Sequence, residues 1–159
     1  MPENANADYQ RVEILLVEDN PSDVELTMAA FEKQRQANRV HVVRDGVEAL
    51  DYLFGAGPYA GRDCRNVPKL ILLDLKLPKV GGIEVLRSLR EDPRTRLIPV
   101  VVLTSSREEK DVEETYRLGI NSYIVKPVEF EKLTELIAHL CIYWLGVNLL
   151  APMPQSEVK

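Results

Sequence analysis

The chain has 159 residues, of which 45% are hydrophobic, so it is long enough for one domain with an ordinary packed core. Its 20 lysine and arginine residues are outnumbered by 25 aspartate and glutamate residues, and the net charge of −5, without any basic run, disfavours direct nucleic-acid binding. Cys64 and Cys141 are too isolated for a disulfide framework or a zinc site, and the sequence has no secretory signal and no apolar run of about 18 residues, so we expect a soluble cytoplasmic protein without membrane insertion.

Five short apolar runs alternate with amphipathic segments of helix length. The runs are residues 12–17, 39–43, 70–75, 98–104 and 121–125. Three of them are almost continuous in valine, isoleucine and leucine, as expected for parallel strands that helices cover on both faces. The alternation therefore predicts a doubly wound α/β fold.

Turn and cap residues separate the predicted helices from the strands. In chain order these markers are Asn20-Pro21, Asp45-Gly46, Gly81-Gly82, Asp92-Pro93 and Gly119. The last helix, from about Glu129, carries one apolar stripe. Its members are Leu133, Leu136, Ile137, Leu140, Cys141 and Trp144.

One connection is unusually long. Residues 54–69 (FGAGPYAGRDCRNVPK) separate a predicted helix from the central strand, whereas most such links have about 2–6 residues. The segment is either a tolerated surface insertion or a contact for a partner, and the sequence favours neither alternative.

Four of the five predicted strands end in polar residues. Glu18-Asp19 ends the first, Asp74 the third and Thr104 the fourth, and Lys126 follows the fifth. In open α/β sheets the ligand site lies outside the carboxyl ends of the strands, at the switch point of strand order. We therefore expect these side chains to share one pocket.

Three carboxylates and one ammonium in one pocket pose an electrostatic problem. At about 4 Å and an effective dielectric constant near 20, each pair of like charges costs about 4 kcal/mol, so either one carboxyl group stays protonated or a cation binds. Oxygen ligands suit Mg²⁺, and Asp74 is then a candidate nucleophile toward a phosphoryl group bound by Thr104 and Lys126. Taken singly, Asp19 and Thr104 could be helix caps and Lys126 a solvated charge, but their conjunction favours a site.

The segments ILLVEDNPSD, LILLDLKLPKVGG, IPVVVLTSS and NSYIVKP together resemble the receiver domain of two-component response regulators, over about residues 12–142. The resemblance implies a flavodoxin-like (βα)5 domain at residues 11–145 whose parallel sheet has the order 2-1-3-4-5. A flexible segment at 1–10 would precede it, and an extension at 146–159 would follow it.

The same resemblance implies a phosphoacceptor and its metal site. Asp74 would accept a phosphoryl group from a sensor histidine kinase or a histidine phosphotransfer protein. Glu18, Asp19, Asp74 and the backbone carbonyl of Lys76 would hold Mg²⁺. Lys76 and Ser106 occupy the positions that tune the lifetime of the phosphoryl group in the family. The protein would catalyse only its own phosphorylation and dephosphorylation.

The resemblance also implies a conformational switch. Thr104 and Lys126 would contact the phosphoryl group, and the peptide bond between Lys126 and Pro127 would be cis. Tyr123 would be the switch residue that turns inward when Thr104 moves. The surface formed by the fourth helix, the fifth strand and the fifth helix would then change.

Two features are similar to the single-domain regulators of bacterial and cyanobacterial phytochromes: the connection at 54–69 and the apolar tail CIYWLGVNLLAP. The tail adds apolar residues beyond the core stripe, and a helix end that is apolar on all sides must be covered. We expect a homodimer through the last helix and the tail. A tail packed on its own domain is the alternative.

Three other functions compete with a signalling phosphoacceptor that has no output domain. A phosphatase with an aspartate nucleophile would typically carry a second aspartate two residues later, where this chain has Lys76. A flavin binder would need donor groups where the loop EDNPSD is acidic. A receiver-like interaction module that works without phosphate remains open.

Overall fold

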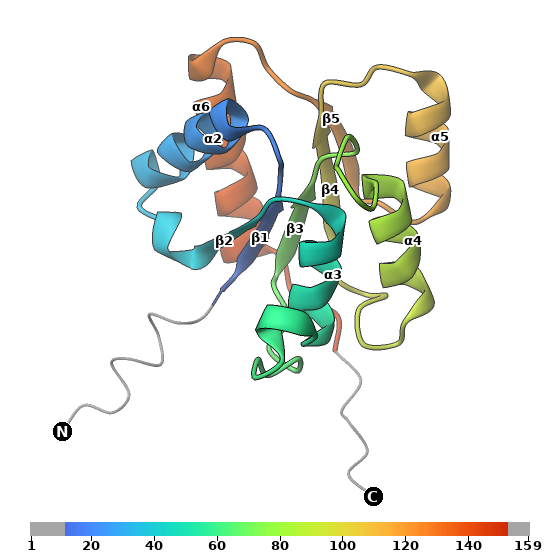
Figure 1. Cartoon of the computed structure of the whole chain (residues 1–159). Helices are drawn as coiled ribbons and strands as arrows, with labels where there is room; N and C mark the ends of the chain where they lie inside the picture. Colours follow the sequence, from blue (N-terminus) through green and yellow to red (C-terminus); the bar gives the residue numbers. More distant parts are fainter. Residues whose placement is uncertain (1–11, 153–159) are drawn as a thin grey trace, which may run out of the picture.

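The structure is a computed structural model that describes residues 12–152, in which five short strands form the centre and helices lie on both sides (Figure 1). The strands are β1 (Ile14–Val17), β2 (Val40–Val43), β3 (Leu70–Leu73), β4 (Val100–Thr104) and β5 (Ser122–Val125). The α-helices are α2 (Pro21–Lys33), α3 (Gly46–Phe54), α4 (Gly82–Glu91), α5 (Glu109–Arg117) and α6 (Phe130–Leu140). Two short 3₁₀ turns, η1 (Ala37–Arg39) and η2 (Gly57–Tyr59), and a π-helical segment, η3 (Cys141–Val147), complete the elements.

All strand pairs of the sheet are parallel, in the order β2-β1-β3-β4-β5. The predicted doubly wound fold and its strand order are therefore confirmed. From β1 the chain proceeds to one edge of the sheet, and from β3 it proceeds to the other. The switch point of strand order consequently lies between β1 and β3, where ligand sites of such sheets are found.

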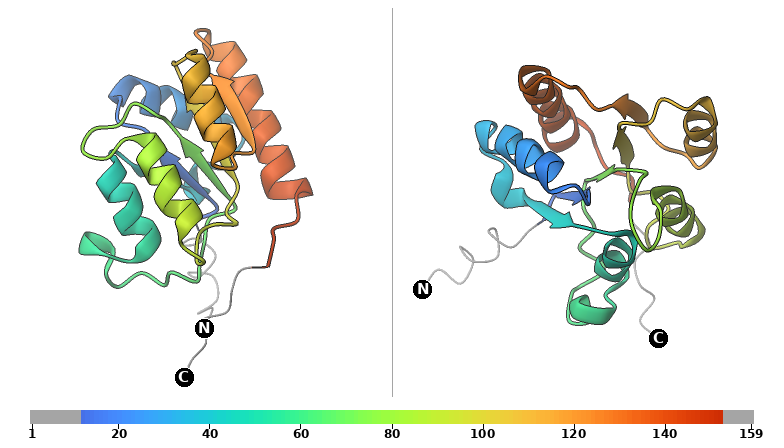
Figure 2. Two further views of the ribbon diagram at one scale, coloured as in Figure 1. Left: turned by 90° about the vertical axis from the view of Figure 1, so that its right-hand side faces the viewer. Right: turned by 45° about the horizontal axis from the view of Figure 1, so that its top comes forward.

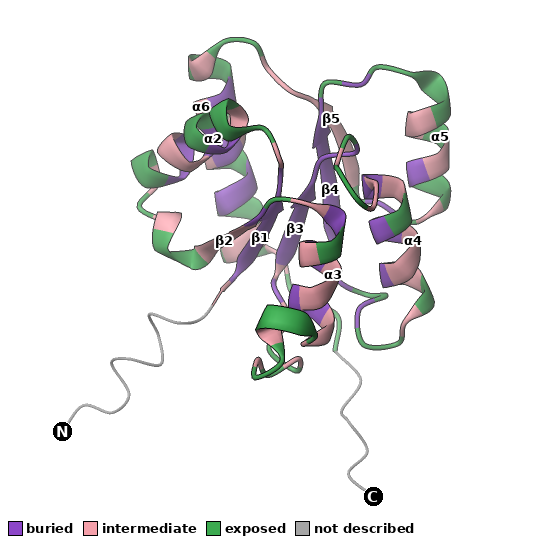
Figure 3. Ribbon diagram, viewed as in Figure 1, coloured by how far each residue is buried: buried purple, intermediate pink, exposed green. Residues whose placement is uncertain are grey.

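Two hydrophobic cores cover the two faces of the sheet. Helices α2 and α6 lie side by side on one face, where Phe31 and Ile137 are fully buried. Helices α3, α4 and α5 lie on the other face, where Leu86 and Leu89 are fully buried (Figure 2). Because β1, β3 and β4 are covered on both sides, every residue in them is buried, which explains their nearly continuous apolar sequences (Figure 3).

The predicted helix caps are in place. The side chain of Asn20 accepts a hydrogen bond from the backbone N–H of Asp23 at 3.1 Å, and Pro21 is the first residue of α2. Asp45 caps α3 in the same way, through the N–H of Glu48 at 2.7 Å. Gly119 follows α5 with a φ of 78°, in the left-handed region that favours glycine.

The long connection at 54–69 is anchored to the domain. The guanidinium of Arg62 lies 4.0 Å from the centre of the Tyr52 ring, and it donates to the carbonyl oxygens of Tyr52 and Asn66. The ring of Tyr59 packs edge-on against those of Tyr52 and His41. The segment is therefore fixed on α3 and β2 by its own contacts, which are compatible with either predicted role.

The last helical segment extends beyond Trp144, the last residue of the predicted apolar stripe. Leu133, Ile137, Leu140 and Cys141 are buried as predicted, and the chain stays helical to Val147.

The predicted flexible segment at 1–10 and the end of the tail lie outside the described residues. Within residues 12–152, no helix combines the length and the apolar character needed to cross a membrane.

Candidate functional site

Backbone hydrogen bonds fix the polar residues that follow the strands. The N–H of Glu18 donates to the carbonyl of Val43 at 3.0 Å, and the N–H of Asp74 donates to that of Val17 at 3.0 Å. The N–H of Lys126 donates to the carbonyl of Thr104 at 2.8 Å. The ladder of the sheet thus continues one residue past three strand ends and holds the backbones of these residues in register.

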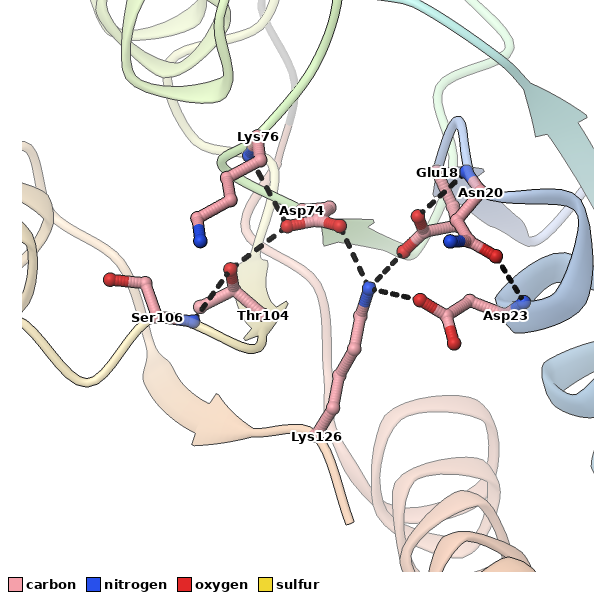
Figure 4. A network of polar contacts seen from close by, with 8 residues as sticks. All are labelled: Glu18, Asn20, Asp23, Asp74, Lys76, Thr104, Ser106 and Lys126. Atoms are coloured by element: carbon pink, nitrogen blue, oxygen red, sulfur yellow. Dashed lines mark hydrogen bonds and ion pairs between the residues drawn. The ribbon is translucent and has the colours of Figure 1, made fainter. Parts of the chain in front are cut away.

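Asp74 lies at the centre of the site, with both carboxylate oxygens in hydrogen bonds (Figure 4). Its Oδ1 accepts from the hydroxyl of Thr104 at 2.9 Å and from the backbone N–H of Lys76 at 3.3 Å. Its Oδ2 accepts from the ammonium of Lys126 at 2.8 Å. Asp74 is only 6% exposed and Thr104 is fully buried, so the sheet places a buried carboxylate among three hydrogen-bond donors.

The ammonium of Lys126 contacts three carboxylates. Its Nζ lies 2.6 Å from Glu18, 2.8 Å from Asp74 and 2.9 Å from Asp23 (Figure 4). The sequence interpretation missed Asp23, because an acid in the first turn of a helix usually reflects the helix dipole. Its position three residues after the cap Asn20, on the helix that follows the first acidic pair, is the signal that could have identified it.

Burial and charge separate the pKa values of the two buried carboxyl groups. Burial raises the pKa of Glu18 to about 7, helped by the charge of Asp74 and opposed by Lys126. Burial acts on Asp74 in the same direction, but hydrogen bonds with Lys126, Glu18 and Thr104 outweigh it, and the pKa of Asp74 is lowered. The pKa of Lys126 is raised, because Asp74, Glu18 and Asp23 together outweigh its burial. Near neutral pH the site therefore contains an ionised Asp74 and a charged Lys126.

The acidic residues fit a divalent cation. Glu18, Asp19 and Asp74 each offer one carboxylate oxygen, and these atoms lie within 4.8 Å of one another. Carboxylate oxygens are hard ligands of the kind that Mg²⁺ and Mn²⁺ prefer. Three acids beside a single lysine leave an excess of negative charge, which a cation would offset. Lys76 lies beside this group, and its backbone N–H contacts Asp74.

Tyr123 is half-buried and lies against the loop that follows β4. Its hydroxyl donates to the carbonyl oxygen of Ser106 at 2.9 Å, and the backbone N–H of Ser106 lies 3.4 Å from the Thr104 hydroxyl. Ser106 therefore connects the two residues expected to act together as the switch.

The prediction of a cis bond between Lys126 and Pro127 was wrong. Residues 12–152 contain no cis peptide, so this bond is trans. The trans form of a bond before proline is intrinsically favoured by about 0.5–1 kcal/mol. The ammonium of Lys126 reaches its three carboxylates with the trans bond, so these contacts do not require the cis form.

A parallel sheet of this order, with an acidic cluster at its switch point and a lysine after the last strand in contact with it, defines a receiver-type α/β domain. The family model of the response regulator receiver domain matches residues 14–138, and the chain belongs to this family.

Three relatives cover most of the chain. The probable methanogenesis regulatory protein FilR2 of Methanothrix harundinacea is 45% identical over 138 residues, which are 85% of this chain and 84% of FilR2. The phosphorylated cyanobacterial phytochrome response regulator RcpA superimposes with a TM-score of 0.79 and 40% identity, over 87% of this chain and 97% of RcpA. Response regulator Rcp1 of Synechocystis is 37% identical over 132 residues, which are 83% of this chain and 88% of Rcp1. The Mn²⁺-bound form of Rcp1 superimposes with a TM-score of 0.78 and 36% identity, over 87% of this chain and 98% of that structure. The chain is thus a response regulator of the receiver-domain class, homologous to phytochrome response regulators.

Proposed function

We propose that this protein is a single-domain response regulator in which Asp74 accepts a phosphoryl group from a sensor histidine kinase. One observation carries the proposal: a buried carboxylate with a lowered pKa lies between an ammonium and a hydroxyl that can bind phosphoryl oxygens. The phosphorylated state of RcpA supports the same chemistry here.

The chemical step requires an ionised acceptor and donors for the transferred group. An oxygen of Asp74 attacks the phosphorus of a phosphohistidine, the new O–P bond forms, and the N–P bond breaks as the imidazole leaves with its electron pair. Lys126 and Thr104, which now contact the two oxygens of Asp74, would bind oxygens of the transferred group. Mg²⁺, held by Glu18, Asp19, Asp74 and the Lys76 carbonyl, would offset negative charge on the phosphoryl oxygens.

Thr104 and Tyr123 would couple phosphorylation of Asp74 to a conformational change at the protein surface. Thr104 would move toward the phosphoryl group, Tyr123 would turn inward, and the surface of α5, β5 and α6 would change. A ligand or modification shifts a conformational equilibrium only by its differential interaction with the two states, and the Thr104 hydroxyl supplies such a difference.

Homology to phytochrome response regulators supports a phytochrome-type kinase or a histidine phosphotransfer protein as the donor of the phosphoryl group.

We propose a second copy of the chain as a further partner. Ile142 and Val147 are 65% and 67% exposed on η3, and Leu149 beyond it is 93% exposed. Apolar side chains so close together favour a covered surface. Cys141 belongs to the core, so a test should leave it in place.

The dimer proposal is tested by sedimentation of the double variant Ile142→Ser/Val147→Ser at micromolar concentration. We expect a dimer for the wild type and a monomer for the variant. Leu97→Ser, which changes an exposed leucine outside the tail, should remain dimeric. A monomeric wild type would contradict the proposal.

The phosphoacceptor proposal is tested by the mass of the intact protein after incubation with acetyl phosphate and Mg²⁺. We expect one phosphoryl adduct in the wild type and none in Asp74→Asn or in the presence of a chelator. Release of inorganic phosphate without any adduct would favour an aspartate-nucleophile phosphatase. If neither acetyl phosphate nor a phosphorylated phytochrome-type kinase gave an adduct, the result would favour an interaction module that works without phosphate.

A further inference from the structure

Ser106 is a buried junction between the candidate site and the helix that follows it. Its side chain and backbone are 5% exposed, and its polar atoms each have a partner. The N–H approaches the hydroxyl of Thr104 at 3.4 Å, and the carbonyl oxygen accepts from the hydroxyl of Tyr123 at 2.9 Å. The hydroxyl donates to Oδ2 of Asp111 at 2.6 Å. One residue thus contacts both expected switch residues and helix α5.

The start of α5 depends on this junction. The cap residue Glu108 makes no side-chain hydrogen bond to the helix start. Instead, the hydroxyl of Ser106 accepts from the N–H of Glu108 at 3.3 Å while it donates to Asp111 in the first turn. Asp111 is half-buried and has no ion pair among the described residues, so its carboxylate is available to hold Ser106. We call this hydrogen bond the Ser106–Asp111 latch.

We propose that Asp111 is a positioning residue that, through the Ser106–Asp111 latch, stabilises the unphosphorylated arrangement of residues 104–111. The inference rests on the proposed function and adds the regulation of the same site. Among the described residues, Asp111 has no hydrogen bond or ion pair with Asp74 or Lys126, and its side-chain hydrogen bond is with Ser106. Its charge also acts on the nearby hydroxyl of Tyr123, and Asp111→Asn removes that charge while it keeps an acceptor for Ser106. When Thr104 moves toward a phosphoryl group, its hydroxyl leaves the N–H of Ser106. The latch holds Ser106 to α5 and therefore opposes a movement of Ser106 that follows Thr104.

Linkage fixes the direction of the effect. An interaction that stabilises one of two arrangements disfavours every event that requires the other, by the same factor. Weakening the latch should therefore make Asp74 easier to phosphorylate. It should also loosen the first turn of α5 in the unphosphorylated protein.

The experiment measures the initial rate of Asp74 phosphorylation by acetyl phosphate and Mg²⁺, from the intact mass of the full chain. The rate is proportional to the population of the arrangement that reacts, and loss of the latch raises that population. We therefore expect Asp111→Ala to be phosphorylated about 5- to 10-fold faster than the wild type. Asp111→Asn keeps an acceptor oxygen for the Ser106 hydroxyl, so its rate should return toward that of the wild type. Glu113→Ala removes another carboxylate from the same helix, one that pairs with Arg117 at the surface, and should leave the rate unchanged.

A double-mutant cycle separates the latch from general damage to the helix. In a Ser106→Ala background the hydroxyl donor is gone, so the further change Asp111→Ala should have no effect on the rate. Hydrogen exchange gives a second measurement: residues 106–112 of unphosphorylated Asp111→Ala should exchange as fast as those of the phosphorylated wild type.

The outcomes distinguish the two proposals. If the wild type is phosphorylated and Asp111→Ala reacts at the same rate or more slowly, the latch proposal fails while the proposed function stands. Faster exchange without a faster reaction would mean that Asp111 only stabilises the first turn of α5, and this result too would overturn the latch proposal. If the wild type takes up no phosphoryl group from acetyl phosphate or a kinase, both proposals fail together.

Discussion

The ammonium of Lys126 lies 2.9 Å from the carboxylate of Asp23, a residue 103 positions earlier in the chain. Asp23 is not one of the three acids that fit a metal ion, yet its charge offsets that of Lys126 beside them. If Asp23 becomes neutral, the charge of Lys126 is less compensated and repels a cation more strongly. The ion pair between Asp23 and Lys126 therefore favours metal binding, because it reduces the repulsion between Lys126 and the cation.

We predict that Asp23→Asn lowers the affinity for Mg²⁺ by about 3- to 10-fold, since one charge is removed at a partly exposed position. Isothermal titration calorimetry with MgCl₂ measures the change. Glu25→Gln is a matched control, because Glu25 is exposed on the same helix. Equal affinities of Asp23→Asn and the wild type would mean that the Lys126 contact does not influence the metal site.

The guanidinium of Arg90, on α4, joins three segments of the chain by donating to four carbonyl oxygens at 2.8–2.9 Å. These oxygens belong to Leu118, Arg96, Ile98 and Gly119. Partial burial lowers the pKa of Arg90, but the carbonyl acceptors supply the partners that a partly buried charge requires. The planar guanidinium directs its N–H donors toward all four oxygens at once, and the ammonium of a lysine cannot reproduce this geometry.

We predict that Arg90→Lys lowers the free energy of unfolding by about 2–3 kcal/mol, because the partly buried carbonyl oxygens of Leu118 and Ile98 lose their donors. Urea denaturation followed by circular dichroism measures the loss. Arg87→Lys changes an arginine of the same helix that forms ion pairs at the surface, and it should cost less than about 1 kcal/mol. Similar losses in both variants would contradict the structural role of Arg90.

The fold was predictable because its signals are local. Each strand is a short apolar run, and residues such as Asn20, Asp45 and Gly119 mark helix ends through contacts within a few positions. The residues at the site were predictable for a related reason: in a parallel sheet the strand ends lie on one edge, so Glu18, Asp74 and the other predicted site residues had to meet.

The features that could not be predicted depend on contacts between distant segments. Asp23 is placed at the site by Lys126, and the anchoring of residues 54–69 depends on the packing of Tyr59 against His41. Local sequence does not fix the isomer of the bond before Pro127, so the cis bond that the resemblance implies was wrong for this chain. The Ser106–Asp111 contact, five positions apart, requires the loop geometry that only the structure gives.

Gly82 allows α4 to begin against the backbone of Asp74. A Cβ atom at this position would lie 2.3 Å from the carbonyl oxygen of Asp74 and 2.6 Å from the Cα of Leu75. Both neighbours are backbone atoms of the strand end, so neither can move without shifting Asp74. The glycine is therefore required by space rather than by its own conformation.

We predict that Gly82→Ala lowers the free energy of unfolding by about 2–3 kcal/mol and slows phosphorylation of Asp74 about tenfold or more. Urea denaturation and the acetyl phosphate reaction measure the two effects. Gly61→Ala is the control, because a Cβ atom there meets nothing within 4 Å and the residue lies outside the tail. A Gly82→Ala protein with wild-type stability and rate would contradict the packing argument.

His41 lies in an aromatic cluster that makes stability depend on pH. Its ring stacks on that of Tyr52 with centroids 4.6 Å apart, and its Nε2 lies 2.9 Å from the hydroxyl of Tyr59. Burial lowers the pKa of His41; the charge of Glu48 opposes this shift, and that of Arg62 adds to it. Burial and Glu48 raise the pKa of Tyr59 to about 12, so the Tyr59 hydroxyl stays protonated throughout the range in which His41 titrates.

The sign of the pH effect follows from proton binding. Below about pH 6.5, the usual pKa of histidine, the unfolded chain binds a proton at His41 before the folded protein does, so stability falls as the pH decreases. We predict that the wild type is more stable than His41→Gln at pH 7.5 and that the difference narrows as the pH falls to 5.5. Urea denaturation of both proteins across this range, in the presence of a chelator, measures the difference. Because all other titrating groups are common to the two proteins, a difference that stays constant or widens at low pH would show that His41 does not stabilise the fold through its neutral form.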